Sequence, residues 1–152
     1  MSKVVAIIIA RTGSSRLPGK VLRTLGEQSV ITWSVRAAQH AAGVDQVIVA
    51  TTTKDNDNAI QAWCDANGVP CFRGAENDVL SRFTGAAEAY HATIAVRITA
   101  DEPFIDPEVI AAVVRLQRNT GCDYASNVEP RTWPDGLDVE AVSIEALRYA
   151  NA

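Results

Sequence analysis

The chain has 152 residues, of which 47% are hydrophobic and 21% are charged, and its net charge is −4. This composition is typical of a single soluble globular domain and excludes an intrinsically disordered chain. A net negative charge argues against a general nucleic-acid-binding surface. No apolar run approaches the ~20 residues that a membrane-spanning helix requires.

Taken in order, the chain begins with an apolar, β-branched run at residues 4–9, which predicts a strand buried on both faces. Hydrophobic periodicity, Gly and Pro punctuation and helix-capping residues define the segments that follow. The sequence predicts helices over residues 30–42, 55–67, 77–91, 106–121 and 143–150, and strands over residues 44–50, 69–72, 93–98, 123–126 and 138–143.

Strands and helices alternate along the chain with short connections, and no repeat or linker interrupts them. This alternation predicts an α/β protein with three α/β/α layers, in which a mostly parallel, Rossmann-like sheet has helices on both faces. Ligands of such sheets bind beyond the carboxyl ends of the strands. We therefore look for functional residues directly after each predicted strand.

The first such segment, residues 10–20, is basic and rich in glycine and hydroxyl side chains. Arg11, Arg16 and Lys20 supply positive charge, and Gly13 and Gly19 allow close approach of backbone N–H groups, as anion binding requires. The spacing does not match the P-loop, and no dinucleotide-binding fingerprint is present. The segment is thus predicted to be a phosphate-binding loop of another class, the alternative being a solvated basic loop without a ligand.

Polar residues also follow the other predicted strands: Thr51 and Thr52 after the second, Arg73 after the third, and Asp101 and Glu102 after the fourth. Cations opposite a carboxylate are what a nucleoside triphosphate with a divalent metal requires. Asp101 is the candidate Mg²⁺ ligand, with Glu102 as a weaker one. Asp106, which precedes a proline and a predicted helix, is expected to be an N-cap without a catalytic role.

These residues predict displacement at an α-phosphorus with pyrophosphate as the leaving group. Such chemistry depends mainly on alignment and charge neutralisation. Arg11, Arg16 and Lys20 are expected to hold the β- and γ-phosphates. Asp101, through Mg²⁺, is expected to hold the α-phosphate and the incoming oxygen.

The three cysteines have no C-x-x-C spacing and are odd in number. Neither a disulfide framework nor a zinc site follows from this pattern. We expect buried, reduced thiols in a cytoplasmic protein.

Several segments together resemble the sugar-acid cytidylyltransferases, which include acylneuraminate and 3-deoxy-manno-octulosonate cytidylyltransferases. The match is closest to the branch called spore coat polysaccharide biosynthesis protein F. The matching segments are residues 6–22, 72–74, 78–83, 96–107, 124–127 and 134–140, in family order.

The resemblance implies a nucleotide-diphospho-sugar transferase fold, CTP as the donor, Mg²⁺ as the cofactor and a small acidic sugar as the acceptor. By similarity, Asp101 matches the metal-binding aspartate. Residues expected to contact the triphosphate are Arg11, Ser14, Ser15, Arg16 and Lys20. Those matching the cytidine pocket are Ala10, Thr51, Arg73 and Asp78. The acids placed by similarity near the sugar or dimer region are Asp135, Asp138 and Glu140.

Relatives of this family continue for about another eighty to a hundred residues, which usually add a dimer arm and a second metal-binding aspartate. We therefore expect residues 1–152 to form one nucleotidyltransferase domain lacking the family's C-terminal part. The expected activity is transfer of CMP to an acidic sugar for cell-surface or spore polysaccharide biosynthesis. The resemblance also implies a homodimer. The alternatives are a non-catalytic CTP-binding module and a related enzyme with another nucleotide donor.

Overall fold

The structure, a computed structural model, describes residues 2–131 and 133–152. Its strands are β1 (Val4–Ile9), β2 (Thr24–Leu25), β3 (Gln28–Ser29), β4 (Gln46–Thr52), β5 (Cys71–Gly74), β6 (Ile94–Thr99), β7 (Tyr124–Ser126) and β8 (Glu140–Ser143). Its α-helices are α1 (Val30–His40), α2 (Asn58–Asn67), α3 (Val79–Ala89), α4 (Pro107–Thr120) and α5 (Ile144–Ala150). Two short 3₁₀ turns lie at Lys20–Leu22 and Asp55–Asp57.

Six strands form one sheet in the order β5-β4-β1-β6-β8-β7, and β2 and β3 form a separate small hairpin. Strands β5, β4, β1 and β6 are parallel to their neighbours. Strand β8 is antiparallel to both β6 and β7. The predicted mostly parallel α/β architecture is confirmed, whereas the insertion of the last strand between β6 and β7 was not foreseen.

The chain changes direction across the sheet at β1. From β1 it moves outward through β4 to β5, then returns over α3 to place β6 on the other side of β1. In an open α/β sheet, the two loops that leave such adjacent strands diverge and leave room for a ligand. The loops after β1 and β6 are therefore the expected walls of a site.

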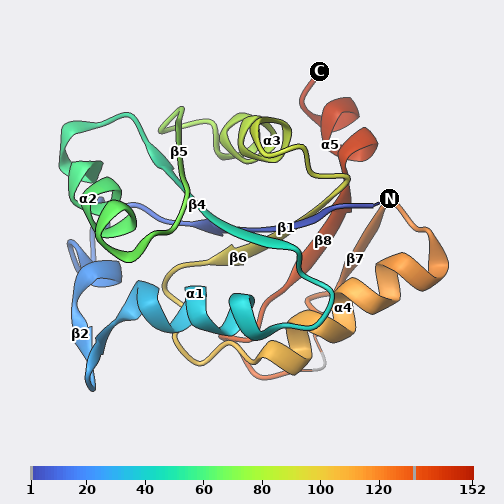
Figure 1. Cartoon of the computed structure of the whole chain (residues 1–152), viewed down its shortest axis with the longest axis horizontal. Coiled ribbons are helices and arrows are strands. Elements are labelled where there is room, and N and C mark those ends of the chain that lie inside the picture. Colours follow the sequence, from blue (N-terminus) through green and yellow to red (C-terminus); the bar gives the residue numbers. More distant parts are fainter. Residues whose placement is uncertain (1, 132) are drawn as a thin grey trace.

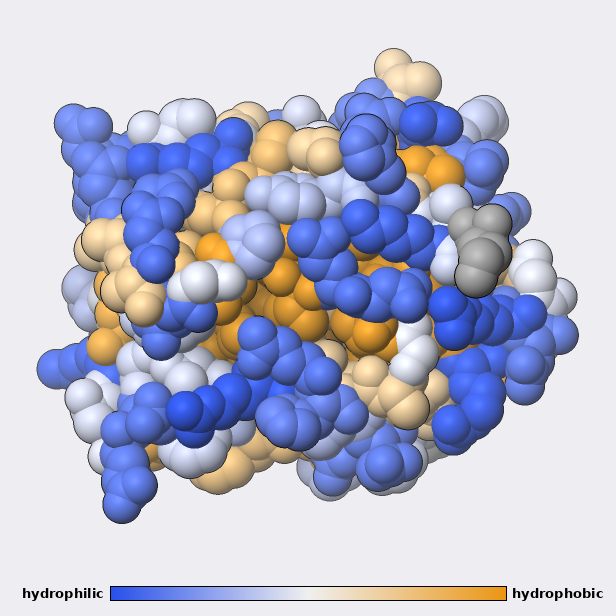
Figure 2. All heavy atoms as spheres, viewed as in Figure 1, coloured by the Kyte–Doolittle hydropathy of each residue, from blue (hydrophilic) through white to orange (hydrophobic). Residues whose placement is uncertain are grey.

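Helices cover both faces of the sheet (Figure 1). Alternate residues of β1 enter two cores: Ala6 and Ile8 pack in the core that contains buried residues of α1, α2 and α4, and Val5 and Ile7 in the core of α3 and α5. Figure 2 shows apolar side chains in a central band, at the position of β1, β4 and β6 in Figure 1, with hydrophilic side chains above and below. Burial of both sheet faces explains the continuous apolar sequence of β1.

Most predicted helix ends are confirmed. Asp106 precedes α4 and its Oδ1 accepts a hydrogen bond from the backbone N–H of Glu108 at 2.7 Å. Ser143 similarly caps α5 through the N–H of Ala146 at 3.2 Å. Gly121 ends α4 with a left-handed backbone, a φ of 65° that glycine adopts without a Cβ clash.

Some predicted details are wrong. The helical spacing of apolar residues in 77–91 and 106–121 predicts that Val79, Leu80 and Leu116 face the core, but Val79 and Leu80 are exposed in the first turn of α3 and Leu116 is exposed in α4. The second and third strands also extend farther than predicted. Thr51 and Thr52 lie inside β4, and Arg73 inside β5, because each pairs with the neighbouring strand.

Cys64 is buried and Cys71 and Cys122 are half-buried, and all three are free thiols. The prediction of buried thiols is therefore confirmed for Cys64 but not for Cys71 and Cys122. In the described residues, no helix has the length and apolarity needed to cross a membrane.

Candidate functional site

A cavity of about 480 Å³ lies where the loops after β1 and β6 diverge. Residues from both loops line it, together with residues at the start of α3. The residues predicted from the sequence that it brings together are Arg11, Ser14, Ser15, Arg16, Lys20 and Asp101. The structure therefore assembles the whole predicted triphosphate-contacting set opposite the predicted metal ligand.

Lys20 and Asp101 join the two loops directly through an ion pair between Lys20 Nζ and Asp101 Oδ2. Both side chains remain partly exposed. Burial acts to raise the pKa of Asp101, but the hydrogen bond and the positive charge of Lys20 outweigh it and lower the pKa below its ordinary value. Asp101 is therefore ionised at neutral pH, as a metal ligand must be.

Helix α1 holds the loop that contains Asp101 through hydrogen bonds from Ser34. Ser34 is fully buried, and its hydroxyl donates to the carbonyl oxygens of Ala100 at 3.4 Å and Glu102 at 3.1 Å. Because both carbonyls flank Asp101, a residue of the α1 core sets the position of the candidate metal ligand.

The donor set fits a magnesium ion held mainly by its substrate. In the part of the chain that the structure describes, no group of three or more His, Cys, Asp or Glu side chains could enclose a metal ion. Mg²⁺ in nucleotide sites is bound through one or two carboxylates, with phosphate and water oxygens completing its shell. Asp101, ionised and bordering a cation-lined cavity, suits this role.

The residues predicted for the cytidine pocket do not line this cavity. Ala10 and Thr51 are buried in the sheet region. The Arg73 guanidinium donates to the carbonyl oxygens of Thr52 and Lys54, both at 2.7 Å, and to the Asn58 side chain. Asp78 caps α3 by accepting from the Ser81 N–H at 2.8 Å. In this conformation, the polar side chains of Arg73 and Asp78 are engaged by the protein itself.

The cavity includes further polar residues that were not assigned to the site from the sequence: Glu76, Asn77, Arg82, Arg97 and Thr99. Arg97 and Thr99 occupy alternate positions on β6, and Asn77 precedes α3. The position of Arg97 on the predicted strand 93–98, with Thr99 directly after that strand and before Asp101, was the available signal. Their alternation places them on the same face of the sheet.

Arg82 is the most unexpected of these residues because only 2% of it is exposed. Its Nη1 donates to the carbonyl oxygens of Ala75 and Glu76, while its Nε has no partner among the described residues. Burial, and next the charge of Arg11, lower the pKa of Arg82. The lining of the cavity therefore combines a buried cation, Arg82, with the exposed cations Arg11 and Arg16.

A smaller hollow of about 130 Å³ adjoins Arg97 and Thr99 and is otherwise lined by Glu102, Asp138 and Glu140. Arg97 pairs with Glu140 at 3.1 Å. Burial raises the pKa of Glu102 to about 7, and the nearby negative charges of Asp138 and Asp101 act in the same direction. This hollow is thus rich in carboxylates, in contrast to the cationic cavity.

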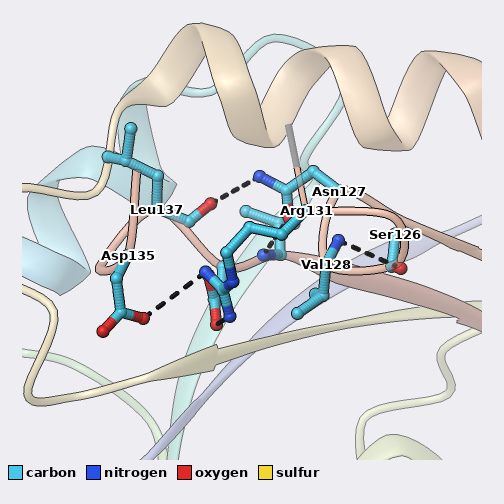
Figure 3. Close-up of polar contacts among 8 residues, drawn as sticks. Ser126, Asn127, Val128, Arg131, Asp135 and Leu137 are labelled. Carbon is cyan, nitrogen blue, oxygen red and sulfur yellow. Dashed lines mark hydrogen bonds and ion pairs between the residues drawn. The ribbon is translucent and has the colours of Figure 1, made fainter. Parts of the chain in front are cut away.

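The loop between β7 and β8 borders this region and is tied together by its own polar contacts (Figure 3). Asn127 donates to the Leu137 carbonyl at 2.6 Å. Arg131 pairs with Asp138 at 2.6 Å and with Asp135 at 3.4 Å. The loop therefore brings Asp138 to the hollow beside Glu140, the first residue of β8, whereas Asp135 remains largely exposed.

Comparison with known proteins places this geometry in context. The family model described as "Cytidylyltransferase" matches residues 5–135. The spore coat polysaccharide biosynthesis protein SpsF of Bacillus subtilis is 38% identical over 128 residues, which are 82% of this chain and 53% of that protein. The 3-deoxy-manno-octulosonate cytidylyltransferase of Anaeromyxobacter dehalogenans is 41% identical over 116 residues, 75% of this chain and 47% of that enzyme.

Among solved structures, a cytidylyltransferase from Leptospira borgpetersenii superposes with a TM-score of 0.93 at 32% identity. The superposition covers 99% of this chain and 64% of that structure. The chain thus spans about half the length of the two relatives above.

Proposed function

Because the chain belongs to the cytidylyltransferase family, we propose that it transfers CMP from CTP to an acidic sugar and releases pyrophosphate. The observation that supports this most strongly is the cavity between the β1 and β6 loops. Its lining places the cations Arg11, Arg16 and Lys20 together with the ionised carboxylate of Asp101. This is the charge distribution that a magnesium-bound triphosphate complements.

In this proposal, Arg11, Arg16 and Lys20 bind the β- and γ-phosphates. Negative charge accumulates on the pyrophosphate as the bond to the α-phosphorus breaks, so fixed cations at these positions stabilise the transition state more than the ground state. Ser14 and Ser15 offer hydroxyl donors on the same loop. The loop therefore both binds the donor and stabilises its leaving group.

Asp101 would hold the metal, with phosphate oxygens as the remaining anionic ligands. A bound Mg²⁺ supplies charge neutralisation and orientation for in-line displacement at phosphorus. Ser34 helps to hold the Asp101 carboxylate in place, because its hydroxyl donates to the carbonyl oxygens on either side of Asp101.

Two observations support an acidic acceptor: the similarity to a 3-deoxy-manno-octulosonate cytidylyltransferase and the position of Arg97. This residue lines both the cationic cavity and the carboxylate-rich hollow. Its guanidinium is a candidate partner for the carboxylate of the sugar, and Asp138 and Glu140 are candidate acceptors for sugar hydroxyl groups.

The test is pyrophosphate release from CTP, with Mg²⁺ and a panel of acidic sugars. Asp101→Asn, which preserves shape and removes charge, is the matched variant and should lose activity. The donor is tested separately by thermal stabilisation with each of the four ribonucleoside triphosphates. Stabilisation by CTP alone supports the cytidine assignment, and equal shifts for all four contradict it.

The second candidate is CTP binding without turnover. It requires only the cationic cavity between the β1 and β6 loops and no contact with an acceptor. This alternative predicts stabilisation by CTP that persists in Asp101→Ala, together with no pyrophosphate release by the wild type with any acceptor.

A further inference from the structure

The basic loop between β1 and the Lys20–Leu22 turn is closed on itself through Thr12. The Thr12 carbonyl oxygen accepts hydrogen bonds from the backbone N–H of Ser14 at 2.8 Å and of Gly19 at 2.9 Å. Because these two amides lie at opposite ends of the basic segment, the position of Thr12 determines where the intervening residues, including Arg16, can lie.

Thr12 is itself held by one buried side chain, that of Asp57. Both the backbone N–H and the hydroxyl of Thr12 donate to Asp57 Oδ1 at 2.7 Å. The other carboxylate oxygen, Oδ2, accepts from the hydroxyl of Thr52 at the end of β4. Within the described chain, the two bonds to Asp57 are the only hydrogen bonds joining residues 11–19 to any part beyond residue 22.

The chemistry of Asp57 matches this task. An ionised carboxylate only accepts hydrogen bonds, and here three donors converge on it. Burial acts to raise the pKa of Asp57, but the hydrogen bonds from Thr52 and Thr12 outweigh it and lower the pKa. A buried charge is costly unless it is hydrogen-bonded in this way, and only 2% of Asp57 is exposed.

A helix-capping role does not explain this arrangement. Asp57 occupies the N-cap position of α2, where an aspartate would ordinarily accept a hydrogen bond from the first turn of the helix. Its side chain accepts no such bond. The carboxylate is instead directed to the loop and to β4.

We propose that Asp57 is a positioning residue that fixes the phosphate-binding loop to the end of β4 and so preorganises Arg11 and Arg16 for the triphosphate. This inference rests on the proposed function only in that CTP supplies the phosphates. Without the anchor, the loop would have to be ordered when the ligand binds, and the entropy of ordering would weaken binding. Asp57 acts through Thr12 and does not touch the ligand.

The central variant is Asp57→Ala, and Asp57→Asn is the partial rescue, since its amide oxygen can still accept from Thr12. Asp55→Ala is the matched control, because it removes one negative charge from an exposed position of the same 3₁₀ turn. Thr12→Val and Thr12→Ser form a second pair, of which only the first loses the hydroxyl. This pair tests the anchor even if Asp57→Ala does not fold.

The first measurement is backbone amide hydrogen exchange without ligand. Asp57→Ala and Thr12→Val should accelerate exchange in residues 11–20 at least tenfold and leave the central strands β1 and β6 unchanged. Asp57→Asn and Thr12→Ser should show smaller effects, and Asp55→Ala none. Unchanged exchange in residues 11–20 in both Asp57→Ala and Thr12→Val would overturn the proposal, whatever the affinity for CTP.

The second measurement compares dissociation constants for CTP and for cytidine, which lacks the phosphates. Asp57→Ala should weaken CTP binding about tenfold and change cytidine binding less than twofold. Equal weakening of both ligands would point to general damage and overturn the positioning role, as would unchanged CTP binding despite faster exchange. A wild-type chain that bound no CTP would refute the proposed function, while the exchange measurement would still decide the anchor.

Discussion

Glu102 offers a test of how the site's carboxylates affect stability. Its Oε2 is buried without a hydrogen-bond partner among the described residues, and burial raises the pKa of the group to about 7, from 4.5. The folded protein therefore binds a proton at Glu102 more tightly than the unfolded chain does. As pH rises from about 4.5 to 7, ionisation of the buried Glu102 carboxyl increasingly lowers the free energy of unfolding. Above pH 7 this destabilisation is constant.

The size of the effect follows from the pKa. A pKa difference of one unit corresponds to about 1.4 kcal/mol, so the destabilisation by ionised Glu102 should be about 2 to 3 kcal/mol larger at pH 8 than at pH 5. Glu102→Gln removes the ionisation and preserves the shape. The variant should therefore gain about that much stability relative to the wild type between pH 5 and pH 8.

The assay is urea unfolding of both proteins at the two pH values, in the presence of a chelator so that no divalent metal binds at Asp101. Groups that titrate independently of Glu102 are common to both proteins and cancel in the difference. Glu27→Gln, at an exposed position in the turn between β2 and β3, removes the same charge far from the hollow and serves as the control. A Glu102→Gln effect that is the same at pH 5 and pH 8 would refute the reasoning.

Three further predictions concern ligand binding and packing. Arg16→Ala should weaken CTP binding by ~1.5–3 kcal/mol in calorimetry if its charge contacts phosphate. Unchanged affinity would support the alternative that the loop is a solvated basic segment without a ligand. Gly74→Ala should destabilise the fold by about 1–3 kcal/mol in urea unfolding, because the added Cβ would lie 2.9 Å from Arg82 Cγ and 3.0 Å from a Phe72 ring carbon. Asp106→Ala should cost about 1 kcal/mol in thermal unfolding through loss of the α4 cap, and an unaltered melting temperature would contradict that role.

The order and type of the main elements could be predicted because they depend on local patterns. The β-branched runs of β1 and β6 are buried on both faces of the sheet, and glycines end α2 and α4. The placement of the basic loop opposite Asp101 followed from the rule that parallel strands present their carboxyl ends at one edge. Local sequence and sheet geometry were sufficient for this part of the site.

Other features depend on partners distant in the sequence. The antiparallel position of β8 is set by pairing with β6 and β7, which no periodicity in residues 138–143 encodes. Val79 and Leu80 fit an apolar helix stripe, yet both are exposed in the first turn of α3, where Val79 borders the cationic cavity, and Arg82 is buried instead. Helical spacing predicts which residues share a face but not where the neighbouring layer stops.

Two polar residues that the sequence did not assign, Asp57 and Arg82, are buried and hydrogen-bonded within the protein. Asp57 stands just before α2 and is indistinguishable by sequence from an ordinary cap, although its carboxylate binds a loop 45 positions away. Conversely, Arg73 looked like a ligand-binding cation, and the structure shows its guanidinium bound to two carbonyls and Asn58. Side-chain type alone does not separate a group available to a ligand from one used by the fold.

The ion pair between Lys20 and Asp101 has a thermodynamic consequence. A divalent cation approaching Asp101 alone would meet the ammonium group already bound there, and triphosphate alone would meet the carboxylate bound to Lys20. Phosphate offers the lysine another partner, and the metal offers the aspartate one. We therefore expect positive coupling between metal and nucleotide, each increasing the affinity for the other by the same factor.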